Sequence, residues 1–595
     1  TVTRLTNSVD PLVFAAEAYL KEHLMDAVCN PCTNPGVSVF LTLSDTPPAE
    51  MKNPEQGYTL VATQDRITIT GFGPAGLYYG VRTLVQALDH DAGRYTLPCV
   101  TITDWPALAT RGHFMECRYG SNLMTLSDWK HVVDVLAEQK MNQLVVGVYG
   151  CWCVQYDGRI SEYLYLPLPQ YSKLQTPVVS RYYSVLQDTW VDRQELPPMF
   201  RDDFFGELIA YGKQNGVTVF PLFNSYGHNT LIPRLYPEVS ARTADGTPTG
   251  HGFCVSCEET YEMLFTIYDH IIDTYLKPNG IDSFHIGMDE VRNEIATDVS
   301  DVHRIVPPWC ECPACAQHSK EENFLRHAVR LISHLKARGM KNIYIYQDML
   351  VTMKIPDAFM SAMREADLLD VVVTDWWSYE DVKGMLMYQD LRPDLNLRST
   401  IKPMNGYYHW NLLTDAMRNN ALIFEIGTRD GAEGVQSYSA WDESYDRVHN
   451  CQSDYAWNFK GAGSLVDVTE RYIKRNFAGK AQLARRAFAF IDRLAEPNPV
   501  QAPGAWYSDS LQNFLFYECA YYVFSYVQTN KPYPRNFPGE PLSVLSDNRE
   551  QSIGRLNTIA ALAGEAYDLF LQIAEDSSCN VPMARRYAYE MGNYQ

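Results

Sequence analysis

Short apolar segments alternate with longer amphipathic segments from about residue 110 to residue 440 of this 595-residue chain. The apolar segments have the length of buried strands, and the longer ones carry apolar residues at helical spacing. The expected strands are 111–116, 142–149, 217–223, 282–287, 342–347, 369–374, 399–405 and 433–438. The expected helices are 125–139, 204–215, 258–277, 321–338 and 355–366. Thr125 or Ser127 is the expected N-cap of the first of these helices.

About eight strand–helix units in roughly 350 residues favour a (β/α)8 TIM barrel, because a doubly wound sheet usually has fewer units. The chain is too long for one hydrophobic core, so flanking domains are expected. We predict a small α/β domain over residues 1–105, the barrel over 106–465 and a helical C-terminal region over 466–595. The expected elements outside the barrel are strands 58–61, 66–70 and 97–104 and helices 77–88, 480–494 and 553–574.

The bulk composition excludes several classes of partner. The net charge of -21 argues against nucleic acid and against an anionic membrane, since both need basic patches. The sequence has no run of about 18 apolar residues, so no transmembrane helix is expected. The N-terminus begins Thr1-Val2-Thr3-Arg4 without an apolar signal core, and together with the many cysteines this favours a cytoplasmic location. A trimmed mature protein would begin in the same way.

The end of one expected barrel strand carries two adjacent carboxylates, Asp289 and Glu290, after the apolar segment 284–288. Catalytic groups of such barrels lie at the C-terminal ends of the strands. Two neighbouring anions are costly, so we expect the two side chains to have separate roles. A glycosidase needs such a division, with one group donating a proton to the leaving oxygen and another stabilising positive charge at the sugar.

Residues 284–290, Phe-His-Ile-Gly-Met-Asp-Glu, resemble the His-x-Gly-x-Asp-Glu signature of the family 20 glycoside hydrolases, the β-N-acetylhexosaminidases. Further matches occur in the family's order over roughly residues 55–445. They are residues 76–84 in the small domain, Asp104-Trp105-Pro106, Arg111-Gly112 and Arg118 at the barrel entry, Gly227-His228 after the third strand, and Trp441-Asp442-Glu443 at the eighth.

The resemblance implies retaining, exo-acting hydrolysis assisted by the substrate's own 2-acetamido group, through an oxazolinium intermediate. Glu290 would be the general acid and then the general base. Asp289 would orient the acetamido N–H and stabilise its developing positive charge. This chemistry needs no cofactor, and the expected partner is a glycan or glycoconjugate ending in β-GalNAc or β-GlcNAc.

The resemblance also implies a set of substrate-binding residues. Arg118 and Glu443 would hold sugar hydroxyls, and Tyr408 or its neighbour Tyr407 would donate to the acetamido carbonyl. The remaining candidates are the aromatic walls Trp376, Trp377 and Trp441, the loop histidine His228, and Asn224 and His285 behind the catalytic pair. Trp376 and Trp377 are adjacent, so on a strand only one of them would face the sugar.

The chain departs from the family pattern at three places. Asn224 stands four residues before His228, where the family usually has Asp, which would weaken a relay that tunes Glu290. Residues 148–155, Val-Tyr-Gly-Cys-Trp-Cys-Val-Gln, replace a strand-two segment that usually supplies a carboxylate to the sugar. Residues 346–348, Tyr-Gln-Asp, stand where a Trp usually leads. The missing carboxylate predicts a β-GalNAc preference, unless Asp157 or Glu162 restores the contact.

Two other functions stay open from the residues alone. One is a β-glycosidase with a carboxylate nucleophile, in which Glu290 pairs with Asp375 or Glu443. The other is a barrel that binds a glycan without cleaving it. The oligomeric state is also open, with a homodimer as one option.

Fourteen cysteines are present, and three of them form the tight series Cys310-x-Cys312-x-x-Cys315. This spacing allows three thiolates around one structural zinc ion. Cys254 or Cys257 could supply the fourth ligand from the preceding βα loop. Free thiols in a reducing compartment are the alternative.

Overall fold

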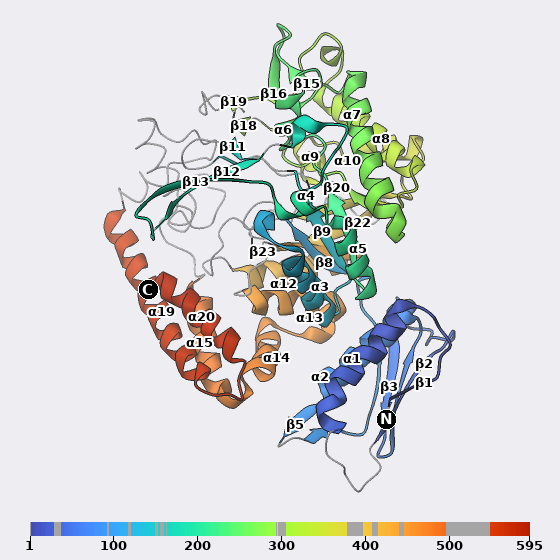
Figure 1. The fold of residues 1–595 in the computed structure, drawn as a ribbon, viewed down its shortest axis with the longest axis vertical. Helices are drawn as coiled ribbons and strands as arrows, with labels where there is room; N and C mark the ends of the chain where they lie inside the picture. Colours follow the sequence, from blue (N-terminus) through green and yellow to red (C-terminus); the bar gives the residue numbers. More distant parts are fainter. Residues whose placement is uncertain are drawn as a thin grey trace.

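The computed structural model describes residues 2–28, 37–91, 94–116, 121–148, 153–154, 160–161, 164–175, 177–184, 186–292, 294–295, 305–377, 397–406, 415–439, 445–494 and 548–595. Three parts follow one another along the chain (Figure 1). An N-terminal α/β part lies at the lower right of this view, a barrel lies in the middle, and C-terminal helices lie at the lower left.

The N-terminal part is a five-stranded sheet covered by two helices that contact each other, α1 (Pro11–Val28) and α2 (Pro74–Ala87). In sheet order its strands are β1 (Val2–Arg4), β2 (Ser38–Leu43), β4 (Arg66–Gly71), β3 (Tyr58–Ala62) and β7 (Val100–Asp104). A small hairpin of β5 (Asp89–Asp91) and β6 (Arg94–Thr96) follows α2. Apolar residues of α1, α2 and the sheet form one buried core, including Val13, Leu77 and Ile69, so this part has its own hydrophobic centre.

The middle part is a closed barrel in which every neighbouring strand pair is parallel. Pairing of the seventh strand with the eighth, and of the eighth with the first, closes the sheet. The strands are β8 (Thr110–Met115), β9 (Gln143–Gly147), β14 (Thr218–Leu222), β17 (Ser283–His285), β20 (Asn342–Tyr346), β21 (Val372–Trp377), β22 (Arg398–Lys402) and β24 (Gly434–Ser439). The short β23 (Met404–Gly406) also pairs with β24. The predicted TIM barrel is therefore confirmed.

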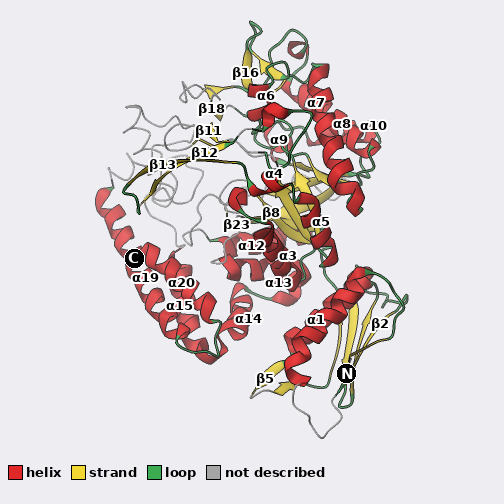
Figure 2. Ribbon diagram, viewed as in Figure 1, coloured by secondary structure: helices red, strands yellow, loops and turns green. Residues whose placement is uncertain are grey.

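Helices follow the strands and surround the barrel (Figure 2). They are α3 (Leu126–Glu138), α5 (Phe205–Gln214), α7 (Glu258–Ile271), α8 (Lys320–Ala337), α10 (Pro356–Glu365), α12 (Ala416–Asp430) and α13 (Asp446–Ala462). Of the two N-caps predicted for α3, the structure uses Thr125, whose side chain accepts from Asp128 N in a capping box. Burial of Trp129, Val132 and Leu136 shows why this segment is helical, since its apolar residues fall on one face.

Long excursions leave the C-terminal ends of the second, third and fourth strands. The β-hairpins in them are β10 (Cys153–Val154) with β11 (Ile160–Ser161), β12 (Val178–Ser184) with β13 (Thr189–Glu195), β15 (Ser240–Arg242) with β16 (Pro248–Phe253), and β18 (Glu294–Ile295) with β19 (Ile305–Val306). Short helices α4 (Pro198–Asp202), α6 (Leu231–Leu235) and α9 (Asp348–Thr352) lie between barrel elements. These excursions lie at the same end of the barrel as the strand ends that carry the predicted site.

Two strands differ from prediction in a way that affects the site. The sixth strand was expected at residues 369–374 but runs over Val372–Trp377, because a turn holds Val371 N against Leu368 O at 3.1 Å. The fourth strand ends at His285 rather than at residue 287. Trp376 and Trp377 are thus strand residues, and the segment carrying Asp289 and Glu290 is irregular.

The C-terminal part is helical, as predicted. Its helices are α14 (Leu465–Phe477), α15 (Ala481–Leu494), α19 (Arg549–Ala574) and α20 (Val581–Tyr594). Helix α19 contacts both α15 and α20, and aromatic rings from three helices, such as Phe488, Phe570 and Tyr587, pack in the interior. Among the helices that the structure describes, none combines the length and hydropathy needed to cross a bilayer.

Buried Arg111 joins the N-terminal part to the first barrel strand. Its guanidinium donates to Gln56 Oε1 at 2.7 Å and to Tyr79 Oη at 3.2 Å, both from the N-terminal part. It also donates to Leu108 O at 2.8 Å and to Lys140 O at 2.8 Å. Because a buried guanidinium must have its donors satisfied, this residue holds the two parts in contact.

Candidate active site

The segment after β17 takes an unusual backbone path that presents two carboxylates at the barrel end. Gly287, Met288 and Glu290 have φ values of +67°, +71° and +44°. Met288 and Glu290 are therefore in a region that side chains disfavour, and such strain concentrates at functional sites. A Cβ at Gly287 would lie 2.7 Å from Asn224 Oδ1, so glycine is required where the chain passes the third-strand loop.

Asp289 is held by the loop that follows β14. Asn224 Nδ2 donates to Asp289 Oδ1 at 2.8 Å, and Asn224 Oδ1 accepts from Met288 N at 3.1 Å. His228 Nε2 lies 3.6 Å from Asp289 Oδ2. Burial raises the pKa of Asp289; the nearby His228 opposes this rise and Glu290 adds to it. The side chain remains 18% exposed, so one edge of the carboxylate can meet a ligand.

Glu290 contacts a different set of partners. Its Oε2 lies 3.0 Å from His228 Nε2 and 2.8 Å from Arg292 Nη2. Its backbone N–H donates to Asp348 Oδ2 at 2.8 Å. The side chain is only 7% exposed. The two adjacent carboxylates therefore have separate environments, which is what separate chemical roles require.

Asp348 is a third carboxyl beside this pair; it is half-buried and opens α9 just after the fifth barrel strand. Burial raises its pKa well above the usual range, and the charges of Asp289 and Glu290 raise it further. A neutral carboxyl still accepts the Glu290 N–H, so the contact survives protonation. Neither Arg292 nor Asp348 was predicted as a site residue. The barrel-end rule was the available signal for Asp348, because it lies two residues after β20.

His285 points into the barrel interior, beneath the carboxylate pair Asp289 and Glu290. Gly287 N donates to His285 Nδ1 at 3.0 Å, which leaves Nε2 as the protonated nitrogen facing Asp375 Oδ2 at 3.2 Å. Burial lowers the pKa of His285 to about 4, although Asp375 opposes the shift. His285 is therefore neutral near pH 7, which fits its predicted place behind Asp289 and Glu290.

Asp375 is fully buried and already paired. Lys402 Nζ lies 2.8 Å from its Oδ2, and Thr400 donates to its Oδ1 at 3.1 Å. Burial alone favours the neutral acid, but Lys402 and His285 hold the pKa of Asp375 below its usual range. A carboxylate with 0% exposure cannot reach a sugar, which argues against Asp375 as the nucleophile considered from sequence.

The structure separates the two tryptophans of β21. Trp376 is buried, and its indole N–H donates to Thr374 Oγ1 at 2.8 Å, so both side chains lie on the strand face away from Asp375. Trp377 shares the face of Asp375 and is half-buried. Gln347 Nε2 donates to Trp377 O at 3.0 Å. The structure therefore does not bring Trp376 to the site, and Trp377 is the candidate of the two.

Several predicted residues lie outside the described part of the chain. They are Arg118, Tyr407, Tyr408, Trp441 and Glu443, together with most of the strand-two replacement segment. The four predicted zinc ligands, Cys254, Cys310, Cys312 and Cys315, do come together. Their sulfur atoms all lie within 4.8 Å of one another.

Comparison with known families gives two adjoining matches. Residues 15–105 match the model described as glycosyl hydrolase family 20, domain 2, and residues 116–377 match the catalytic domain of the same family. Together the two models span more than half of the chain. The second model includes β17 and both Asp289 and Glu290, and it ends with β21.

Individual relatives agree with this match. A β-hexosaminidase of Akkermansia muciniphila is 26% identical over 44% of this chain and 48% of its own length. A β-hexosaminidase subunit beta of Entamoeba histolytica is 24% identical over 71% of this chain and 72% of its own length. The chain thus spans about half the length of the first of these relatives.

Solved structures support the fold. The X-ray structure of Flavobacterium johnsoniae chitobiase aligns with all of this chain and 89% of its own, with a TM-score of 0.55 and 14% identity. At that identity the likeness concerns the fold alone. With two family models covering successive parts of the chain, and the family's paired carboxylates at the end of the fourth barrel strand, the protein belongs to glycoside hydrolase family 20.

Proposed function

We propose that this protein is an exo-acting, retaining β-N-acetylhexosaminidase that removes terminal β-linked 2-acetamido sugars from a glycan or glycoconjugate. The observation that carries the proposal is the pair Asp289 and Glu290. Both contact His228, but Asn224 donates only to Asp289, whereas Arg292 pairs with Glu290. Family membership supports the same substrate class, since the relatives are named β-hexosaminidases.

In the first step, Glu290 donates a proton to the glycosidic oxygen while the bond from that oxygen to C1 breaks. The carbonyl oxygen of the substrate's 2-acetamido group forms the new bond to C1, which gives an oxazolinium ion. In the second step, water attacks C1 and gives its proton to Glu290, and the oxazolinium ring opens. Two inversions at C1 retain the configuration.

Asp289 acts on the acetamido group. Its carboxylate would accept the acetamido N–H and stabilise the positive charge that develops on the nitrogen. The bond from Asn224 to Oδ1 supports this role, because it fixes the carboxylate plane before substrate binds. His228 contacts both carboxylates and would hold them in fixed positions relative to each other.

Aromatic and polar residues would complete the sugar site. We assign Trp377 as one aromatic wall, since it shares a strand face with Asp375 at the barrel end. Trp441 would be a second wall. Arg118 and Glu443 would bind hydroxyls, and Tyr408 would donate to the acetamido carbonyl, as the family resemblance implies.

A panel of nitrophenyl glycosides tests the proposal. The protein should cleave β-GlcNAc or β-GalNAc and leave the β-galactoside, which lacks the acetamido nucleophile, essentially untouched. Equal cleavage of the galactoside would support a carboxylate nucleophile instead. Binding of the acetamido sugars without any cleavage would support a glycan-binding barrel.

An N-acetyl-thiazoline inhibitor tests the intermediate. It copies the bicyclic oxazolinium ion, so it should inhibit far more strongly than the free sugar. Inhibition no better than that of the free sugar would contradict the substrate-assisted route. So would a fluorosugar that becomes covalently attached to a carboxylate.

Within this activity we propose a preference for β-GalNAc over β-GlcNAc. The usual strand-two carboxylate is replaced by residues 149–152, Tyr-Gly-Cys-Trp. An aromatic face can pack on the C–H surface that an axial C4 hydroxyl leaves exposed. Shape differences of this kind are worth about 1–3 kcal/mol. The ratio of kcat/KM on the two nitrophenyl sugars tests this preference. A ratio near one, or a preference for GlcNAc, would contradict the proposal. Such a result is expected if Asp157 or Glu162 supplies the missing carboxylate.

A further inference from the structure

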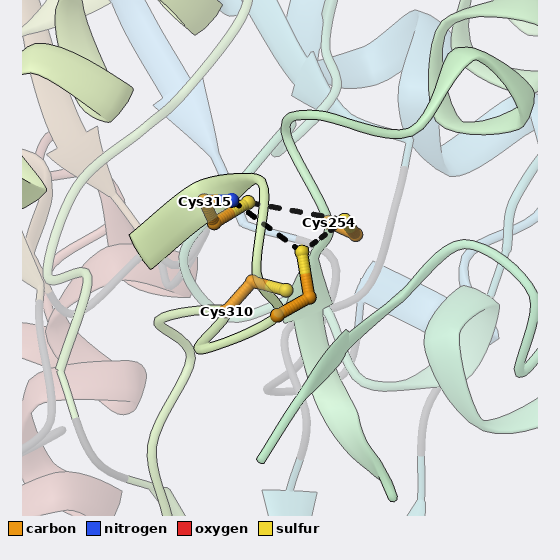
Figure 3. Close-up of side chains that lie close together, drawn as sticks. Cys254, Cys310 and Cys315 are labelled. Carbon is orange, nitrogen blue, oxygen red and sulfur yellow. Dashed lines mark hydrogen bonds between the residues drawn. The ribbon is translucent and has the colours of Figure 1, made fainter. Parts of the chain in front are cut away.

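Four cysteine sulfurs converge between two loops at the active-site end of the barrel. Cys254 follows β16, in the excursion after the third strand, and Cys310, Cys312 and Cys315 lie in the excursion after the fourth. All four sulfur atoms lie within 4.8 Å of one another. Figure 3 shows Cys254 facing Cys310 and Cys315 across the gap between the two loops. Cys254 therefore meets three cysteines that lie 56 to 61 positions later in the sequence.

The spacing of the sulfurs matches tetrahedral coordination of one metal ion. Zinc–sulfur bonds of about 2.3 Å put the sulfurs of a regular tetrahedron about 3.8 Å apart. The sulfur of Cys254 lies 3.7 Å from that of Cys312 and 3.9 Å from that of Cys315. A disulfide would need about 2.05 Å, and all four are free cysteines.

The surrounding backbone holds the sulfurs in place. Cys315 N points to Cys312 Sγ at 3.5 Å, an N–H contact that would also favour a thiolate at that sulfur. Asn323 Nδ2, from α8, donates to Cys315 O at 2.9 Å, and Thr260 Oγ1, from α7, donates to Cys254 O at 2.9 Å. The cluster is therefore supported by the helices behind it and does not depend on the loops alone.

We propose that Cys254, Cys310, Cys312 and Cys315 bind one structural Zn²⁺. Four thiolates in a tetrahedron suit zinc, and four protein ligands leave no open position for catalysis. A four-iron cluster would need sulfurs that are farther apart, because each thiolate binds a different iron. Binding releases the thiol protons, and its free energy adds to the stability of the fold.

The ion would tie together the two loops that shape the active site. Trp309, next to Cys310, packs edge-on against Tyr226 with ring centroids 5.4 Å apart, and Tyr226 lies two residues before His228. His251, three residues before Cys254, contacts Arg292 O at 3.2 Å. The proposal is nevertheless independent of the catalytic one, since a zinc site would stand whatever sugar the protein cleaves.

Metal analysis of the full chain, purified without added metal or chelator, tests the proposal. We expect about one zinc per chain, and release of that zinc when a mercurial reagent titrates the thiols. Replacing zinc by Co²⁺ should give the strong visible absorption of a tetrahedral tetrathiolate site. A metal-free protein in which all four thiols titrate freely, iron in place of zinc, or disulfides between these cysteines would overturn it.

Matched variants separate this site from general effects of losing a thiol. Cys312→Ser should lose the zinc and lower Tm while retaining turnover at low temperature. Cys257→Ser is the control, because Cys257 lies three residues from Cys254 but its thiol contacts Glu238 O and Glu259. That variant should keep its zinc. Zinc retained at full stoichiometry in Cys312→Ser, or lost in Cys257→Ser, would contradict the ligand set.

Discussion

Asn224 donates to Asp289 at 2.8 Å from a position where the family usually carries an aspartate. Its orientation is fixed, because Asn224 Oδ1 accepts from Met288 N and so leaves the amide nitrogen facing the carboxylate. The sequence predicted that an uncharged residue would weaken a relay to Glu290. The side-chain contacts seen for Asn224 are instead with Asp289 and Met288, so its effect falls on Asp289, which we propose orients the acetamido group.

Asn224→Asp should therefore lower kcat. The variant keeps an acceptor for Met288 N but replaces a donor by a second carboxylate beside Asp289, and like charges destabilise each other. We expect a loss of up to about 10²–10³-fold, the scale for losing one electrostatic contact in an active site. The loss should grow as pH rises and the new carboxyl ionises. Asn224→Leu, which removes the donor without adding charge, should show no such pH trend. Wild-type kcat in Asn224→Asp at every pH would refute this.

Asp348 should tolerate an amide. Its pKa is raised well above the usual range by burial and by Asp289 and Glu290, which favours the neutral acid, and a neutral acid still accepts the Glu290 N–H. Asp348→Asn keeps an acceptor and should retain kcat within a few-fold of wild type. Asp348→Leu leaves a buried N–H unsatisfied, at a cost of about 1–3 kcal/mol. Equal losses in the two variants would mean that the charge of Asp348 is needed.

His327 should make the fold sensitive to acid. Burial lowers its pKa to about 4, against about 6.5 in an unfolded chain. The unfolded state therefore binds more protons between these values, and stability is lost as pH falls from about 6.5 to about 4. The loss reaches about 3 kcal/mol. Tm measured against pH should fall less steeply in His327→Gln than in wild type. Exposed His23→Gln is the control, and identical slopes in all three proteins would contradict the argument.

The buried pair Lys402 and Asp375 should contribute to the free energy of unfolding through the interaction between the two charges. Lys402→Met leaves the Asp375 carboxylate buried without its counter-charge, which costs about 3–5 kcal/mol. The double variant Lys402→Met/Asp375→Asn removes both charges, so urea unfolding should show a smaller loss than in the single variant. Additive losses would indicate that the two side chains do not interact.

The barrel was predictable because its signal is local. Each strand–helix unit has its own periodicity, and a cap such as Thr125 marks a helix start without reference to distant residues. The Asp289–Glu290 pair was singled out for a related reason, because the rule for barrel strand ends draws attention to residues just beyond an apolar strand. The resemblance to family 20 then gave the pair its predicted roles.

The contacts of the site could not be predicted in the same way. The hydrogen bond from Glu290 N to Asp348 joins residues 58 positions apart, and nothing in either segment alone predicts it. The faces of Trp376 and Trp377 depended on where β21 begins, and a turn at Leu368–Val371 set that start. A strand's side chains alternate between faces, so the bounds and register of the strand decide which tryptophan turns inward.

Turnover of Glu290→Gln on two substrates with poor and activated leaving groups tests the central claim most directly. The variant cannot donate a proton, so kcat should fall by about 10²–10⁴-fold on the poor leaving group. An activated nitrophenyl leaving group needs little protonation, so the rate of the first step on that substrate should fall much less. Small and equal losses on both substrates would contradict the assignment of Glu290 as the general acid.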